Sequence, residues 1–283
     1  MRVNGSTVLL TGVTGGIGTA LAAELSRRGA RLILTGRRRD AVEPLAKEYG
    51  ARAVVADLAD PEDVERLAAE AAGTEILLAN AALPSSGELL DYAPDQIDRA
   101  LAVNLRAPAM LARLLAPAMV EARRGHLVFV GSISGKTATR HSALYNATKF
   151  GLRGFALGLR QDLHEHGVGV SLVQPGFVRD AGMFAATGAE PPAGMRTVSP
   201  RQVVTGVVRA IERNRAEVNV APPEMRILSA IGGQFPGFSE RFQRRSRGAE
   251  RTPPATPVAA SASTAPPARK PWPSSPRRSP PAT

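Results

Sequence analysis

Short β-type runs alternate with helical stretches through the first 222 residues of this 283-residue chain. The runs carry Val, Leu and Ile on consecutive positions, which is typical of strands covered on both faces. Strand–helix–strand repetition at this spacing predicts a doubly wound α/β fold, a parallel sheet of about seven strands with helices on both faces. The expected strands are residues 7–11, 31–35, 53–56, 75–80, 126–131, 169–174 and 217–221, and the expected helices include 16–28, 61–72, 94–123, 144–165 and 200–213.

The C-terminal part of the chain has a different composition. Residues 223–247 carry apolar side chains and a basic end, which predicts a short helical extension after a folded domain at 1–222. The last 31 residues hold ten prolines, a density that prevents both helix and sheet. We expect residues 248–283 to be a disordered basic tail. From residue 251 to the end, the chain holds five of the basic residues behind the net charge of +11 and no acidic one, which leaves about +6 for the first 250 residues.

Composition also excludes several functions. The chain has no cysteine, which removes disulfides, thiolate metal ligands and cysteine nucleophiles, and no metal site is expected. It has no run of 18 apolar residues, and glycines interrupt the apolar stretch 8–23, so neither a membrane span nor a secretory signal is predicted. A cytoplasmic protein is expected. Basic and acidic residues are interspersed, which argues against specific nucleic-acid binding, whereas contact of the basic stretch 225–247 with a membrane surface stays open.

A glycine-rich segment, TGVTGGIG at residues 11–18, joins the first strand to the first helix. Gly12 permits a tight turn, Gly16 lets the backbone approach a pyrophosphate, and Gly18 lets helix and strand pack closely. The helix N-terminus adds free N–H groups and the positive end of a dipole. This position favours the dinucleotide-binding turn of a Rossmann-type fold over a simple tight turn. The expected cofactor contacts here are Gly12, Thr14, Gly15, Gly16, Ile17 and Gly18.

The end of the second strand indicates which dinucleotide binds. An NAD-specific site places a carboxylate there to accept from the ribose 2′-hydroxyl, but this chain has Gly36 and then Arg37. A guanidinium binds a 2′-phosphate in forked fashion, so Arg37, assisted by Arg38, predicts NADP(H). The alternative is NAD(H), with the arginines only solvating a loop. Asp40 is expected to cap the next helix.

Three further residues combine into a chemical constellation. Tyr145 and Lys149 are four residues apart and share one face of a helix, and Ser132 ends a strand. Strand ends at the carboxyl edge of a doubly wound sheet are where ligands bind. A nearby ammonium favours the tyrosinate and brings an ordinary tyrosine pKa of ~10 toward neutral pH. The set predicts acid/base chemistry beside a bound dinucleotide.

Together these motifs resemble the short-chain dehydrogenase/reductase family, in its single-domain branch, over roughly residues 5 to 222. The resemblance implies that Tyr145 is the general acid/base and that Ser132 orients and polarises the carbonyl. It also implies that Lys149 binds the nicotinamide ribose and lowers the tyrosine pKa, and that Asn104 holds a water of a proton relay. Asp57 and Leu58 follow the third strand, and Asp57 is expected to accept from the adenine amino group. The remaining expected cofactor contacts are Asn80, Ala81, Tyr145, Lys149, Pro175, Gly176 and Val178.

The sequence departs from the family pattern at two places. The usual Asn-Asn-Ala-Gly is Ala-Asn-Ala-Ala at residues 79–82, a mild change because the backbone does most of that work. Asp180 stands where the family usually has a threonine that helps to hold the carboxamide. The glycine run also fits the longer branch with an added substrate domain. The stretch after Pro222 is too short for one.

The expected function is therefore hydride transfer between NADP(H) and a carbonyl or secondary alcohol, by residues Asn104, Ser132, Tyr145 and Lys149. The alternative is a module that senses NADP(H) without chemistry, which has no need of the acid/base set. The segment 182–199, with Met183, Phe184 and Met195, and the aromatic residues Phe235, Phe238 and Phe242 suggest a hydrophobic substrate under a flexible lid. The bland alternative is that these residues only cover the sheet edge. Helices 94–123 and 144–165 match those that pair in the family's oligomers, so a homodimer or homotetramer is expected.

Overall fold

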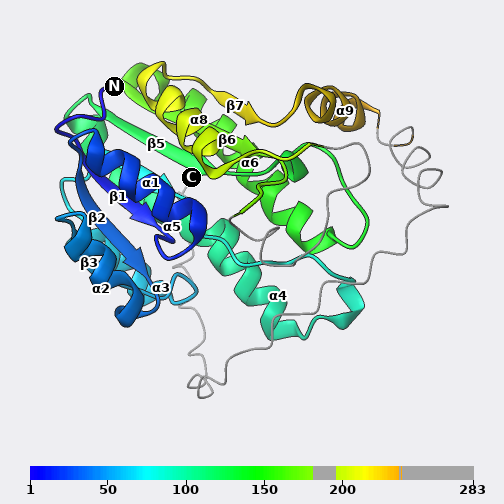
Figure 1. Ribbon diagram of the computed structural model, residues 1–283, viewed down its shortest axis with the longest axis horizontal. Helices are drawn as coiled ribbons and strands as arrows, with labels where there is room; N and C mark the ends of the chain where they lie inside the picture. Colours follow the sequence, from blue (N-terminus) through cyan, green and yellow to red (C-terminus); the bar gives the residue numbers. More distant parts are fainter. Residues whose placement is uncertain (181–195, 236, 238–283) are drawn as a thin grey trace, which may run out of the picture.

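The computed structural model describes residues 1–180, 196–235 and 237, and within them the chain forms one seven-stranded parallel sheet. The strand order is β3-β2-β1-β4-β5-β6-β7 (Figure 1), which confirms the expected doubly wound fold. Each strand end lies within one residue of its expected position. The strands are β1 Thr7–Thr11, β2 Arg31–Gly36, β3 Arg52–Val55, β4 Ile76–Ala79, β5 Gly125–Val130, β6 Val168–Pro175 and β7 Glu217–Val220. Most of the expected lid and the whole expected tail lie outside the described residues.

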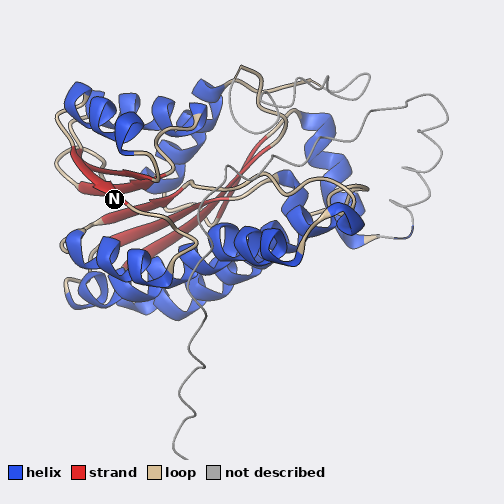
Figure 2. Ribbon diagram, turned by 90° about the horizontal axis from the view of Figure 1, so that it is seen from below, coloured by secondary structure: helices blue, strands red, loops and turns tan. Residues whose placement is uncertain are grey.

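The helices form two layers with the sheet between them (Figure 2). Helices α1, α2 and α8 cover one face, and α3, α5 and α6 cover the other. Successive side chains of β1 point to opposite faces of the sheet. Leu9 therefore packs against α3, α5 and α6, and Leu10 packs against α1, α2 and α8. The bounds are α1 Gly16–Arg27, α2 Arg39–Glu48, α3 Pro61–Glu70, α4 Pro94–Leu101, α5 Ala107–Glu121, α6 Ala143–Leu163, α8 Pro200–Glu212 and α9 Pro223–Gln234.

The strand order reverses between β1 and β4, which are neighbours in the sheet. In open parallel sheets the crevice at such a reversal, beyond the carboxyl ends of the strands, is where ligands bind. The glycine turn follows β1, and Asn80 follows β4 directly. The topology therefore places these two predicted elements on the two sides of one crevice.

Helix α2 is the helix that Asp40 was expected to cap, but its bounds were not predicted, because its charged surface and the interior Pro44 hide its period. Its buried face consists of Val42 and Ala46. The prediction that Asp40 caps this helix is wrong: the N-cap is Arg38, and Asp40 lies in the first turn. A carboxylate there still interacts favourably with the positive end of the helix dipole.

The helix expected at 94–123 contains a π-helical turn, Ala102–Arg106, between α4 and α5. In this turn the Ala107 N–H bonds to the carbonyl of Ala102, five residues back. Pro108 has no N–H and therefore cannot supply the α-helical donor to the carbonyl of Asn104. The proline thus explains why the α-helical hydrogen-bond pattern is interrupted here. The interruption includes Asn104, a predicted site residue.

After β7 the chain enters α9, which lies beside the end of that strand (Figure 1). Met225 on this helix is buried, whereas Ile227, Leu228, Ile231 and Phe235 are exposed. None of the described helices is both long and apolar enough to span a membrane.

Candidate active site

The glycine turn is sterically closed to side chains at two positions. Gly12 has φ of +70°, and a Cβ there would lie 2.7 Å from the Cα of Ala81. A Cβ on Gly18 would overlap the carbonyl oxygen of Gly12. The N-cap of α1 is Gly15, which provides no side-chain cap to the first helical turn. The turn is therefore a close-packed backbone surface whose helix N-terminus is open to an anion.

Thr11, the last residue of β1, connects this turn to the end of β4. Its hydroxyl accepts from the backbone N–H groups of Asn80 at 3.1 Å and Ala81 at 3.0 Å. The amide of Asn80 donates to the carbonyls of Thr11 at 3.1 Å and Gly12 at 3.2 Å. The side chain of Asn80 thus braces the turn, which leaves the backbone of this segment to face the crevice.

The two arginines expected to select the cofactor are exposed after β2. The side chain of Arg39 is bound to Glu43 at 2.6 Å, whereas the guanidinium groups of Arg37 and Arg38 have no ion-pair or hydrogen-bond partner within the described parts of the chain. At Gly36 a Cβ would lie 3.0 Å from Val42 and 3.6 Å from Thr14, so a larger residue would crowd the loop. The loop after β2 thus offers two free guanidinium groups where the sequence predicts a 2′-phosphate.

The predicted adenine contact has a partner within the protein. One carboxylate oxygen of Asp57 is 2.7 Å from a guanidinium nitrogen of Arg99 on α4, and the other accepts from the Ala59 N–H at 3.0 Å. Its neighbour Leu58 is buried. Sequence reasoning missed Arg99, because it lies 42 residues away and belongs to no motif.

The structure brings Ser132, Tyr145 and Lys149 together at the carboxyl end of β5. Ser132 is the N-cap of the 3-10 turn Ile133–Gly135, and its hydroxyl oxygen accepts from the Ser134 N–H at 3.1 Å. That leaves its proton for a hydrogen bond with Tyr145, with which Ser132 interacts. The Lys149 ammonium lies 5.7 Å from the centre of the Tyr145 ring and donates to the Val130 carbonyl at 3.1 Å.

Burial controls the ionisation of both groups. Burial raises the pKa of the Tyr145 phenol, and the hydrogen bond with Ser132 lowers it in part. Burial lowers the pKa of the Lys149 ammonium to about 8. The hydroxyl of Ser132 is therefore the group that favours the tyrosinate here. That Lys149 also lowers the pKa of Tyr145 stays a prediction. Since the phenol keeps its proton at neutral pH, it is poised to act as an acid.

Asn104 holds the loop that connects β4 to the acid/base helix. Its side chain accepts from the Leu83 N–H at 2.6 Å and donates to the Leu83 carbonyl at 2.9 Å. Two residues further on, the Ser85 carbonyl accepts from the Tyr145 N–H at 3.1 Å. Asn104 is 1% exposed, and both ends of its amide are bound to Leu83, so a water on Asn104 stays a prediction. Sequence reasoning missed Ser85, which no motif marks.

Pro175 ends β6 and Gly176 follows it, where the sequence predicts the nicotinamide side of the site. The Gly176 N–H donates to the Val220 carbonyl at 2.9 Å, and a Cβ on Gly176 would lie 2.7 Å from the sulfur of Met225. Val178 is buried and pairs with Val198 across the gap in the described chain. Asp180 has φ of +63° and an exposed side chain 3.5 Å from that of Arg179.

The family model for short-chain dehydrogenases matches residues 6–191, more than half of the chain. The chain belongs to the short-chain dehydrogenase family. This confirms the resemblance drawn from the glycine turn and the Ser–Tyr–Lys set.

Individual relatives agree with this family. The chain is 29% identical to dehydrogenase/reductase SDR family member 7B of Bos taurus over 262 residues, covering 85% of this chain and 81% of that protein. A short-chain dehydrogenase of Sphingobium yanoikuyae, solved in complex with NADPH, superimposes with a TM-score of 0.72 at 27% identity, covering 83% and 95% of the two chains. A metagenomic short-chain oxidoreductase in complex with NADP has a TM-score of 0.64 at 30% identity, covering 77% and 97%.

The residues of this short-chain dehydrogenase fit a nicotinamide dinucleotide. The uncapped N-terminus of α1 suits a pyrophosphate, and the close approach of Ala81 leaves no room for a side chain at Gly12. The free Arg37 and Arg38 suit a phosphate on the ribose. No group of three His, Asp or Glu side chains that could hold a metal ion occurs in residues 1–180, 196–235 or 237.

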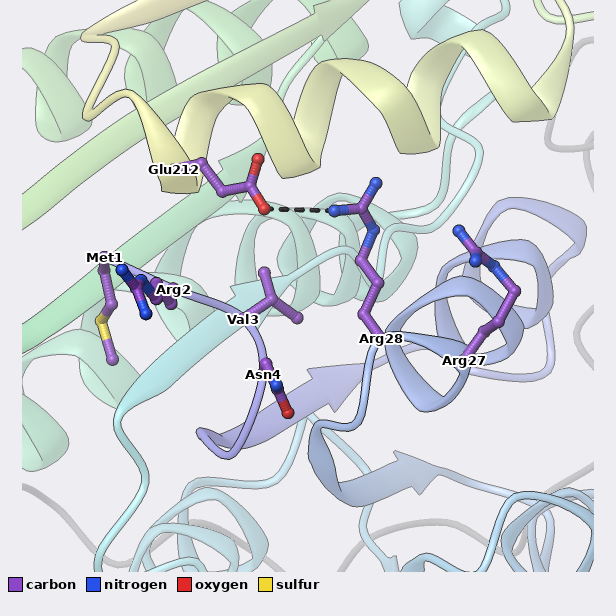
Figure 3. Close-up of a pocket in the computed structure, with 7 residues that line it drawn as sticks. All are labelled: Met1, Arg2, Val3, Asn4, Arg27, Arg28 and Glu212. Atoms are coloured by element: carbon purple, nitrogen blue, oxygen red, sulfur yellow. Dashed lines mark hydrogen bonds and ion pairs between the residues drawn. The ribbon is translucent and has the colours of Figure 1, made fainter.

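A depression at the opposite edge of the sheet lies far from this constellation (Figure 3). It forms where α1 and α8 end and β1 begins, and Glu212 points to Arg28 across it at 3.1 Å. The acid/base groups of the dehydrogenase lie at the carboxyl ends of the strands instead, so this depression has no part in the chemistry. It is lined by Met1, Arg2, Val3, Asn4, Arg27, Arg28 and Glu212.

Proposed function

We propose that this chain is an NADP(H)-dependent oxidoreductase that transfers a hydride between the nicotinamide and a carbonyl or secondary alcohol. The observation that carries the proposal is the Ser132–Tyr145 hydrogen bond with the Lys149 ammonium beside the phenol, at the carboxyl edge of the sheet. A module that only senses the dinucleotide has no use for such an acid/base set, so catalysis is favoured over sensing.

The cofactor would lie along the edge from the glycine turn to Gly176. Gly12, Gly15 and the first N–H groups of α1 would bind the pyrophosphate, and Arg37 with Arg38 would bind the 2′-phosphate. The NADPH and NADP complexes of two relatives support the choice of dinucleotide. When bound, the nicotinamide supplies the hydride in reduction and accepts it in oxidation.

The protein's own groups provide position and a proton. The Ser132 hydroxyl would donate to the substrate oxygen and orient the carbonyl, and Tyr145 would give its phenolic proton to that oxygen as negative charge develops. Lys149 would bind the nicotinamide ribose, and its charge favours the tyrosinate left behind. The backbone carbonyl of Asn104 would hold a water that returns the proton. Removing the proton donor at Tyr145 therefore has to stop turnover.

We also propose an apolar substrate and an oligomeric enzyme. Exposed apolar residues lie on α9 (Ile227, Leu228 and Ile231) and at its C-cap (Phe235). Met225 of this helix packs on Gly176, so the helix borders the proposed cofactor site. On α5 and α6, Leu114 and Phe150 are also exposed, which supports pairing of these helices between copies. Light scattering with size exclusion would show a dimer or tetramer, and a monomer would contradict this.

The function is tested by NADPH oxidation with a panel of ketones and aldehydes, including alkyl ketones of increasing length. Tyr145→Phe removes the proton donor and is expected to lower kcat by a factor of about 10² to 10⁴ while NADPH still binds. Tyr49→Phe is the matched control, because Tyr49 packs beside α2 in the opposite helix layer. For an apolar substrate, kcat/KM is expected to rise by up to about fourfold per buried CH₂. Turnover by Tyr145→Phe above a few percent of wild type would contradict the assignment.

A further inference from the structure

We propose that Glu217 is a positioning residue that fixes the turn carrying Ser132 against the helix carrying Tyr145 and Lys149. This inference rests on the proposed function and adds a residue that no motif of the family marks. Glu217 begins β7, the edge strand of the sheet, and touches neither the expected cofactor contacts nor the acid/base groups. It acts through two cations that it binds.

The carboxylate of Glu217 is bound on both oxygens. One oxygen is 2.8 Å from the Lys136 ammonium, and the other accepts from the Arg153 guanidinium at 2.8 Å. The second oxygen also accepts from the amide of Gln174, which is completely buried. The side chains of Lys136, Glu217 and Arg153 are 14%, 21% and 35% exposed, so this cluster is partly buried and not a fully exposed surface ion pair.

The two cations belong to the two segments that form the catalytic set. Lys136 follows the 3-10 turn whose N-cap is Ser132. Arg153 lies on α6, one turn beyond Lys149 and two turns beyond Tyr145, and therefore on the same helix face. A single carboxylate thus binds both the serine turn and the tyrosine helix.

The two segments also approach each other closely at one point. A Cβ on Gly135 would lie 2.7 Å from the carbonyl oxygen of Lys149, so the serine turn rests directly on the backbone of α6. At such a distance a small displacement of the turn moves the Ser132 hydroxyl relative to the phenol. The cluster around Glu217 lies immediately beside this contact, because Gln174 is 3.5 Å from the same Cβ position.

Helix α9 holds the serine turn from a second direction. A Cβ on Gly233 would lie 2.7 Å from the carbonyl oxygen of Lys136. Lys136 is therefore fixed at its backbone by α9 and at its ammonium by Glu217. Without the carboxylate, the Lys136 ammonium would lose its ion pair, and only packing against α6 and α9 would hold the turn.

The charge balance makes the carboxylate hard to replace. Burial raises the pKa of the Glu217 carboxyl, but the hydrogen bonds from Arg153 and Lys136 outweigh burial and hold the pKa below its ordinary value. The group is thus ionised at neutral pH and faces two cations. Removing its charge would leave both cations partly buried without a counter-charge, which drives them apart or toward solvent.

The test is Glu217→Gln, which keeps the shape and removes the charge. We expect kcat with the best ketone of the panel to fall about tenfold to hundredfold, because small misplacements of reacting groups have effects of that size. KM for NADPH is expected to stay within twofold, because the carboxylate does not touch the proposed cofactor contacts. The pH profile of kcat is expected to move to higher pH, since a weaker Ser132 hydrogen bond lowers the pKa of Tyr145 less.

The matched control is Glu212→Gln. Glu212 also binds an arginine, Arg28 at 3.1 Å, but lies at the opposite edge of the sheet. It is expected to leave kcat and the pH profile unchanged. If Glu217→Gln only lowers the unfolding temperature and leaves kcat and the pH profile as in wild type, Glu217 is merely structural and the proposal is overturned.

A second pair of variants serves if Glu217→Gln does not fold. Lys136→Met removes the ion pair between the carboxylate and the serine turn, and Arg153→Met removes the ion pair between the carboxylate and α6. Each variant leaves Glu217 with one cation. Both are expected to lower kcat and to move the pH profile in the same direction as Glu217→Gln. Wild-type values in both variants would overturn the proposal.

A readout without turnover separates this proposal from the proposed function. The chain has three tyrosines, so ¹³C-labelled tyrosine gives three ring signals, and Tyr145→Phe identifies the one from the site. Glu217→Gln is expected to shift that signal alone, and Glu212→Gln to shift none. If wild type turns over no substrate yet this shift occurs, the proposed function fails and the positioning role stands. An unshifted signal in an active enzyme overturns the positioning role alone.

Discussion

Arg37 is the residue on which the proposed preference for NADP(H) over NAD(H) rests. Its guanidinium is exposed and has no partner in the described structure, so a phosphate would gain a charge-assisted hydrogen bond that no protein group already occupies. Gly36 before it leaves no carboxylate to accept from a ribose hydroxyl.

Arg37→Asp is therefore expected to reverse the cofactor preference. The new carboxylate repels a 2′-phosphate and accepts from a free 2′-hydroxyl, so the ratio of kcat/KM for NADPH to that for NADH should fall by about a hundredfold or more. Steady-state kinetics with both cofactors measure this ratio. Arg39→Asp makes the same charge change at a residue already bound to Glu43 and should leave the preference unchanged. Equal shifts in both variants would assign the effect to the charge of the loop as a whole.

Residues whose role depends on local spacing could be predicted from the sequence. Tyr145 and Lys149 are four positions apart on a helix, and the structure places the ammonium near the ring. Residues whose role depends on distant partners could not. Glu217 meets Lys136 from 81 positions away and Arg153 from 64, and nothing in the sequence pairs them. The same holds for the partner of Asp57, so the ion pair at the adenine end was unexpected.

At the scale of elements, the π-helical turn between α4 and α5 is the feature that bears most on the site. Sequence periodicity predicts one helix over 94–123, because a single added residue in a turn changes the apolar pattern too little to be seen. The signal that was available is Pro108, whose missing N–H deprives the Asn104 carbonyl of its α-helical donor. The bounds of helix α2 could not be predicted for a related reason, since Pro44 interrupts its pattern.

Pro108→Ala tests this turn. Alanine restores the N–H at position 108, which can then donate an α-helical hydrogen bond to the Asn104 carbonyl. That bond would remove the carbonyl from the proposed water relay. We expect kcat to fall about tenfold, without loss of thermal stability because alanine favours helix. Pro117→Ala, in the same helix, is the control and should leave kcat unchanged. Steady-state kinetics and thermal unfolding of the two variants measure both effects. An unchanged kcat in Pro108→Ala would show that the carbonyl is not needed.

At the scale of the whole molecule, the seven parallel strands and the two helix layers could be predicted because apolar runs and helical stretches alternate so regularly. The strand order could not be obtained in this way, since it depends on which strands pair rather than on what each contains. The pairing explains why the site forms: β1 and β4 are neighbours, so the glycine turn and Asn80 meet, and β5 carries Ser132 to the same edge.

The opposite edge of the sheet holds a buried histidine that links folding stability to pH. His126 on β5 is 1% exposed and lies 2.8 Å from the hydroxyl of Ser171 on β6, which in turn donates to the Arg215 carbonyl at 2.6 Å. The imidazole Nε2–H therefore donates to Ser171, and the ring is neutral. Burial lowers the pKa of His126 to about 3, with smaller contributions from the N-terminus and Arg160.

Because the unfolded chain titrates this group near ~6.5, it binds more protons than the folded chain between pH 6.5 and the folded pKa. Stability is thus complete above about pH 6.5 and is lost as the pH falls, by about 2 kcal/mol between pH 6.5 and 5. Carboxylates with lowered pKa values lose their contribution only at lower pH, so this window isolates the histidine.

His126→Gln keeps a donor near Ser171 and removes the titration, so its free energy of unfolding should be lower at pH 7.5 but nearly constant down to pH 5. Urea unfolding at several pH values measures both slopes. His166→Gln changes an exposed histidine after α6 and should keep the wild-type slope. A wild-type protein whose stability does not change between pH 6.5 and 5 would mean that His126 accepts a proton in the folded state, and that the amino edge of β5 and β6 opens to let water reach it.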